Sequence, residues 1–186
     1  MKWQMITYSE ISGMTLPQRF FEYAIAYLNA ASAMCSSMVE DQAMCTWPNA
    51  NVVLLLAAHS TELFLKGAIF SRDPLAKIEH HFLDSLGTEY TRLFPEPQFK
   101  WEIPFRTDWG SLSETEIQVM RKTLPTPSMQ YRYPVSKGGK EWDGVHGFEA
   151  GSFMNVLEQV DQDFQRIMAH IAQSSVPADA FGAAEQ

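Results

Sequence analysis

The sequence VVLLLAAHSTELFLKGAIF, residues 52–70, is the most apolar stretch of the chain and decides its fold. It is long enough to cross a bilayer, but it contains His59, Glu62 and Lys66, each of which would be costly at the centre of a membrane. On a helical wheel these three residues lie within about 60° of one another, and apolar residues occupy the other directions. A helix that is apolar on nearly all sides is normally surrounded by other helices. We therefore expect a core helix whose polar stripe faces partners inside the protein or in a cleft.

Apolar residues recur at three- and four-residue intervals on both sides of this stretch, which predicts a mainly α-helical protein. The expected helices cover residues 17–45, 49–71, 81–94, 114–124 and 149–172. Pro48 breaks the chain before the second of them, and Asn49 or Asn51 is its expected cap. Ser113 and Glu116 have the spacing of a capping box, which predicts the start of the fourth helix.

Two segments lack a helical period. Residues 98–110 contain four aromatic side chains, and we expect an ordered loop that is packed by its rings. Between residues 130 and 145, Tyr131, Tyr133 and Val135 alternate with polar residues and are followed by a Gly-Gly turn signal. This alternation predicts a small β-hairpin.

The length of 186 residues fits one domain, with 46% apolar and 12% aromatic residues as in ordinary globular proteins. We expect a single helical domain over residues 1–173 and a disordered tail over 174–186. Cys35 and Cys45 are too few for a disulfide framework, and we expect both to be reduced core residues. The first residues lack the apolar run of a signal peptide, so we expect a cytoplasmic protein that does not enter a membrane.

The net charge of −8 opposes general nucleic-acid binding, because affinity for phosphates depends on clustered Lys and Arg. The charges are distributed unevenly, however. Residues 117–140 contain five basic residues and no acidic one, while the region from residue 141 to the end is strongly acidic. One basic strip therefore lies in an acidic chain.

Three motifs resemble those of one known family. AAHSTELFLK, residues 57–66, resembles the second-helix signature of HEPN domains, a small residue followed by Glu-Leu-x-Leu-Lys. HHFLDSL, residues 80–86, is similar to the His-x-Leu segment that opens the family's third helix, and QYRYP, residues 130–134, resembles its later Arg-Tyr element. The motifs occur in the family's order. The resemblance implies an up-and-down bundle of four or five helices that forms a homodimer and acts in RNA cleavage, toxin–antitoxin or defence systems, or nucleotide-linked partnerships.

The resemblance also supplies a test of catalysis. Active members of the family carry an Arg followed, after four to six residues, by a His, and this pair acts on the RNA phosphodiester without a metal. Arg166 and His170 come nearest to that spacing, but only three residues separate them. A shift of one residue changes the direction of a helical side chain by about 100°. A metal-independent ribonuclease that uses a displaced Arg166 and His170 pair is therefore kept as the alternative function.

A metal-dependent enzyme that uses histidines of the bundle is a third possibility, because helical bundles can direct several imidazoles at one ion. Only His59 and Glu62 have local spacing that suits metal ligands, and the chain has no HExxH-type motif. We expect no bound metal and no cofactor.

The interpretation that we favour is a non-catalytic HEPN-like module that binds RNA, a nucleotide or a protein partner in a cleft. The predicted binding residues are His59, Glu62, Lys66, Tyr131, Arg132 and Tyr133. Glu62 and Lys66 would lie at the base of the cleft, and the expected hairpin would cover it. In that arrangement Arg132 would reach Glu62 as a charge-assisted partner, because a buried carboxylate needs one.

Overall fold

The structure is a computed structural model, and it describes residues 3, 5–78, 80–107, 109–136, 138–142 and 147–174. The described residues are mainly helical and include no β-strand, so the predicted all-α class is confirmed. The helices are α1 (Ser9–Ser12), α2 (Leu16–Glu40), α3 (Trp47–Arg72), α4 (Leu83–Leu93), α5 (Glu114–Thr123), α6 (Pro127–Gln130) and α7 (Ala150–Ser174), with short 3-10 helices at Gln42–Met44 and Pro97–Phe99. Except for Ser174, the predicted C-terminal tail lies outside the described residues.

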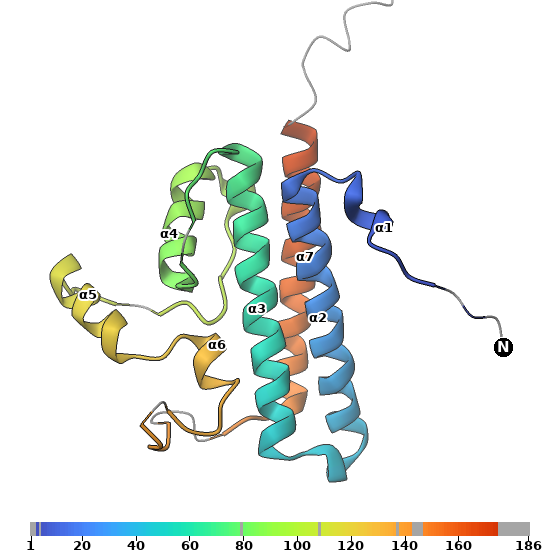
Figure 1. Ribbon diagram of the computed structural model, residues 1–186, viewed down its shortest axis with the longest axis vertical. Coiled ribbons are helices and arrows are strands. Elements are labelled where there is room, and N and C mark those ends of the chain that lie inside the picture. Colours follow the sequence, from blue (N-terminus) through green and yellow to red (C-terminus); the bar gives the residue numbers. More distant parts are fainter. Residues whose placement is uncertain are drawn as a thin grey trace, which may run out of the picture.

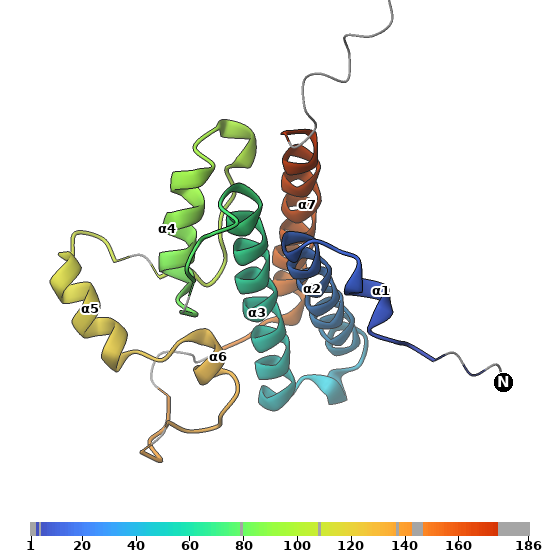
Figure 2. The same cartoon turned by 45° about the horizontal axis from the view of Figure 1, so that its top comes forward.

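Three long helices form the centre of the molecule. Helices α2 and α3 are antiparallel neighbours, and α7 packs against both and runs in the same direction as α3 (Figures 1 and 2). Helix α4 packs against α3 on the side away from α2, and the short α6 also contacts α3. Helix α5 lies farther out, beyond α4 and α6 (Figure 1).

Threonine and serine side chains fix where the helices begin. The predicted capping box of α5 is present, with the Ser113 hydroxyl and the Glu116 side chain each bonded to the other residue's backbone N–H. Helix α3 starts earlier than predicted, because Thr46, and neither Asn49 nor Asn51, is its N-cap. The break assigned to Pro48 is wrong: a proline in the first turn of a helix loses no hydrogen bond, since that N–H has no helical partner.

Helix α3 is the core helix that its sequence predicts. It is the one helix among the described residues that is long and apolar enough to span a membrane, and 72% of its most apolar window is buried within the protein. Phe64 stacks on Phe164 of α7 with ring centroids 3.8 Å apart. On another side, Gly67 allows α2 to approach, because a Cβ at this position would meet the Phe21 ring at 2.9 Å.

Two smaller predictions fail. Cys35 is buried as expected, but Cys45 is exposed because it ends the 3-10 turn after α2. No β-strand occurs in the described part of residues 130–145. There α6 is followed by a tight turn, in which Ser136 N donates to Lys140 O and Gly139 N donates to Ser136 O, both at 2.8 Å. Pro134 lacks the N–H that a paired strand would need, so the alternation of residues did not produce a ladder.

Candidate functional site

The polar stripe of α3 is organised around the carboxylate of Glu62, which is only 4% exposed. Lys66 Nζ donates to Glu62 Oε1 at 2.8 Å, in the i,i+4 order that the sequence shows. His81 Nδ1, from the segment before α4, lies 2.6 Å from the same oxygen. His59 Nδ1 is farther away, 3.8 Å from Oε2. We call Glu62, Lys66 and His81 the Glu62 cluster.

His59 and the other two residues of the cluster together keep Glu62 ionised. Burial by itself would raise the pKa of the carboxyl group, but the interactions with the two histidines and with Lys66 outweigh burial and lower the pKa to about 2. An ionised carboxylate at this depth is tolerated because each of its oxygens faces a partner. The cluster is therefore a charged, fully partnered group inside a helical bundle.

The predicted partnership between Arg132 and Glu62 is wrong. Arg132 is exposed and is not among the ion-pair partners of Glu62, and His81 takes the place expected for it. Tyr131 is half-buried with its ring edge toward Phe105, whereas Tyr133 is 53% exposed.

Arg166 and His170 have separate structural contacts. The Arg166 guanidinium donates to two main-chain carbonyl oxygens of the loop that follows α4, and it pairs with Asp163 at 2.5 Å. The His170 ring meets the ring of Phe99 edge-on, with centroids 5.9 Å apart. Arg166 thus ties the loop after α4 to α7, and no contact in the described part of the chain joins it to His170.

Within the described ranges, no group of three or more His, Cys, Asp or Glu side chains is arranged to hold a metal ion. The contacts of His59 explain why it does not begin such a site: its ring meets that of Tyr27 edge-on at 4.6 Å, and Lys66 already occupies the carboxylate of Glu62. His146 lies outside the described residues.

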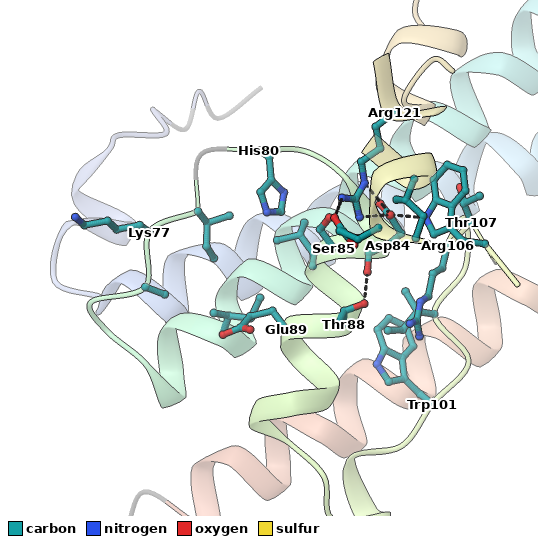
Figure 3. Close-up of a pocket in the computed structure, with 18 of the residues that line it drawn as sticks. Lys77, His80, Asp84, Ser85, Thr88, Glu89, Trp101, Arg106, Thr107 and Arg121 are labelled. Carbon is teal, nitrogen blue, oxygen red and sulfur yellow. Dashed lines mark hydrogen bonds and ion pairs between the residues drawn. The ribbon is translucent and has the colours of Figure 1, made fainter. Parts of the chain in front are cut away.

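A cleft of about 1060 Å³ lies next to the Glu62 cluster. It is bounded by α4, by α5, by the segment between α3 and α4, and by the loop over residues 101–110 (Figure 3). Its charged and aromatic lining residues are Asp73, Lys77, His80, Asp84, Glu89, Trp101, Glu102, Arg106, Trp109, Glu114 and Arg121. His80 belongs to this cleft while its neighbour His81 binds Glu62, so the two features share one short segment.

One carboxylate oxygen holds two walls of the cleft together. Asp84 Oδ2 accepts a bond from Trp109 Nε1 at 2.6 Å and two bonds from Arg121, from Nε at 3.1 Å and Nη2 at 2.6 Å. Burial would raise the pKa of Asp84, but these bonds lower it. No residue of α5 is buried, so the Arg121 side chain is a principal tie between α5 and α4.

Two residues that line the cleft each have a buried polar atom that no described residue satisfies. Trp101 Nε1 and His80 Nδ1 are both buried and lack a hydrogen-bond partner in the described part of the protein. Burial lowers the pKa of the His80 imidazole, and the positive charges of Lys66 and Arg121 lower it further. Because these two atoms have almost no solvent-exposed surface, they do not face the open space of the cleft, which His80 and Trp101 line with other atoms.

Two cations of the cleft have no ion-pair partner in the ranges that the structure describes: Lys77 and Arg106. The Arg106 side chain crosses α4 at Gly87, where an added Cβ would lie 3.4 Å from Arg106 Cδ and 3.1 Å from Ile103 Cδ1. The missing side chain at Gly87 therefore lets the loop with Arg106 lie close along α4. Figure 3 shows Arg106 and Trp101 on the wall opposite His80.

The sequence alone does not predict this cleft. Its walls come from four separate segments, and the motifs found in two of them, HHFLDSL and the capping box of α5, do not indicate that these segments meet. Two signals in the sequence do point to it: the aromatic residues of the loop over 98–110, and Arg121 in the basic strip. Neither signal shows that these residues meet across α4.

Comparisons with known proteins found no match: no protein-family model fits the chain, and neither the curated proteins nor the solved structures include a significantly similar one.

Proposed function

We propose that this chain is a non-catalytic HEPN-like module that binds a nucleotide, free or as part of a single-stranded RNA, in the cleft between α4 and α5. The observation that carries the proposal is the make-up of that cleft. Its volume of about 1060 Å³ is that of a small-molecule site. Its walls combine the indole ring of Trp109 with Lys77 and Arg106, two cations that have no ion-pair partner among the described residues.

Each of these groups suits one part of a nucleotide. Arg106 and Lys77 are cations that can bind a phosphate, and an Arg guanidinium can donate two parallel bonds to it. The half-buried ring of Trp109 offers an apolar surface to a base, whereas the ring of Trp101 packs edge-on against the core rings of Phe64, Tyr90 and Phe164. The imidazole of His80 can accept a hydrogen bond from a sugar hydroxyl or a base N–H.

The acidic residues of the cleft favour the binding of a single nucleotide unit and oppose the binding of a long phosphate backbone. The lining contains five acidic side chains, Asp73, Asp84, Glu89, Glu102 and Glu114, against three basic ones, Lys77, Arg106 and Arg121. Double-stranded nucleic acid is bound mainly through clusters of Lys and Arg, which this surface lacks. Single-stranded RNA can instead place a separate base and phosphate in a pocket.

The three motifs that resemble HEPN domains support the proposal, because that resemblance implies RNA- or nucleotide-linked roles. The motif residue Glu62 lies next to the cleft and outside its lining. The expected homodimer, the cytoplasmic location and binding of a protein partner remain predictions.

Arg106→Ala is expected to weaken the binding of ribonucleoside 5′-monophosphates about tenfold. The physical reason is the loss of a charge-assisted bond to phosphate, which is worth about 1.5 kcal/mol or more. Isothermal titration calorimetry of wild type and variant measures the change, and the tryptophan fluorescence of the cleft provides a second signal. Lys122→Ala is the matched control, since Lys122 is an exposed cation of α5 outside the cleft lining. Equal losses in both variants, or a wild type that binds no nucleotide and no single-stranded RNA, would contradict the proposal.

The same RNA samples test the non-catalytic part of the proposal. We expect a single-stranded and a structured RNA to remain intact during incubation with the purified protein, as judged on denaturing gels. Cleavage by the wild type that disappears in His170→Ala would instead support the ribonuclease alternative.

A further inference from the structure

We infer that the Glu62 cluster positions one wall of the nucleotide cleft: the contact of His81 with Glu62 fixes the segment between α3 and α4, and this segment holds Lys77 and His80 at the cleft. His81 is thus a positioning residue that does not touch the ligand. The identity of the ligand as a nucleotide rests on the proposed function. The anchoring of the segment by His81 does not depend on it.

The wall in question belongs to no helix or strand. After α3 ends at Arg72, the chain passes through residues 73–82 before α4 begins, and five of these residues line the cleft: Asp73, Ala76, Lys77, Ile78 and His80. Polar groups on such a segment keep a fixed direction only where side chains or backbone bonds tie it down.

The start of the wall is tied locally. The backbone N–H of Asp73 donates to Ile69 O at 2.8 Å, and that of Ala76 donates to Asp73 O at 3.1 Å. Leu75 N adds a bond to the Asp73 side chain. These bonds continue the end of α3 and do not reach the residues near α4.

Ala76 and Ile78 pack against the core, and His81 supplies the polar tie at the end of the wall. Its Nδ1 lies 2.6 Å from Glu62 Oε1, and this is the one side-chain hydrogen bond that the described residues between 74 and 82 make to another element. Glu62 is a firm anchor because it is 4% exposed and stands on the buried core helix α3. His81 itself has a side chain that is 64% exposed, so its ring contributes little to the core.

Lys66 connects the cluster to the cleft electrostatically. Its ammonium group binds the same Glu62 oxygen as His81, and its charge also acts on the adjacent His80. A movement of the segment at His81 would therefore change both the direction of His80 and its electrostatic surroundings.

His59 offers an internal comparison. It also approaches Glu62, at 3.8 Å, but it stands on α3 itself and its ring packs against Tyr27. It does not belong to the wall and does not line the cleft. Both histidines approach the same carboxylate. A comparison of His81→Ala with His59→Ala therefore distinguishes the loss of the wall's anchor from a general effect of removing a partner of Glu62.

The test compares His81→Ala, His81→Asn and His59→Ala in the full chain. In the ligand-free protein, hydrogen exchange is expected to become faster over residues 76–82 in His81→Ala, while the melting temperature stays close to that of the wild type. In titrations with ribonucleoside 5′-monophosphates, His81→Ala is expected to bind about tenfold more weakly, because a wall without its anchor would occupy the binding position only about a tenth of the time. His81→Asn is expected to restore both properties, because the Asn side-chain amide can place an N–H near the position of Nδ1.

His59→Ala is expected to change affinity less than twofold and to leave the exchange of residues 76–82 unchanged. Unchanged exchange in His81→Ala, failure of His81→Asn to restore it, or equal effects of the two alanine variants would overturn the inference. The exchange measurement needs no ligand. A wild type that binds no nucleotide would therefore defeat the proposed function, while the exchange data would still decide whether His81 anchors the wall.

Discussion

Glu62→Gln is expected to lower the free energy of unfolding by about 3–5 kcal/mol at pH 7, the usual cost of removing one partner from a buried ion pair. The substitution keeps the size of the side chain but removes its charge. It leaves the Lys66 ammonium, whose side chain is 11% exposed, without an anion inside the bundle. Urea unfolding at pH 7, followed by circular dichroism, measures the difference.

The difference between Glu62→Gln and the wild type is also expected to depend on pH in a defined direction. The pKa of Glu62 is lowered from the ordinary value of 4.5 to about 2 in the folded protein. A carboxyl group with a lowered pKa stabilises the fold fully above its unfolded pKa and loses that contribution as the pH falls through its folded pKa. Protonation of Glu62 therefore removes on the order of 3 kcal/mol from the wild type between about pH 4.5 and pH 2. The two proteins should approach equal stability at the acid end of this window.

Glu158→Gln is the control for both measurements, because Glu158 is an exposed acid of α7 with no ion pair in the described part of the chain. It is expected to change stability by less than about 0.5 kcal/mol. A Glu62→Gln protein as stable as this control at pH 7, or a stability difference that stays constant down to pH 2, would show that Glu62 is not the buried anion described above.

Asp84→Asn is expected to cost about 1.5–3 kcal/mol of stability and to free α5 from the rest of the molecule. Asp84 Oδ2 accepts all the bonds that join Trp109 and Arg121 to α4, and bonds to an ionised group are stronger than those to a neutral amide. Because α5 has no buried residue, loss of this tie should speed hydrogen exchange over residues 114–123. The affinity for nucleotides should fall with it, since α5 forms one wall of the cleft.

Asp161→Asn is the matched control for this prediction. Among the described residues Asp161 bonds to Gln165 of the same helix, and it does not line the cleft. Thermal unfolding, hydrogen exchange and nucleotide titration are measured on the same three proteins. If Asp84→Asn leaves exchange in α5 as slow as in the wild type, Asp84 does not hold α5 in place, and the account of the cleft's two walls fails.

Local patterns in the sequence were sufficient to predict most helices and part of the candidate site. The apolar run around Glu62 identified the core helix, and its i,i+4 spacing to Lys66 identified an ion pair that the structure contains. The capping box at Ser113 correctly located the start of α5. Each of these features depends on residues within one or two helical turns, and such short-range geometry is a direct consequence of the helical period.

Partners from distant segments could not be predicted in the same way. Arg132 was expected to bind Glu62, but His81 does so, because no spacing rule says which loop approaches a buried carboxylate. The hairpin prediction failed for a related reason. Alternation in residues 130–135 requires a second paired strand, and the described residues form α6 and a turn.

The sequence by itself determined that this chain is mainly helical, that α3 is its core, and that Glu62 must be an anion with partners, since apolar periodicity and the cost of burying charge act on any such chain. Only the tertiary structure decided that His81 is one of those partners and that Asp84 joins Trp109 to Arg121 across α4. These contacts connect residues 19, 25 and 37 positions apart. They depend on how the helices and loops pack together, and that packing is set by the whole core.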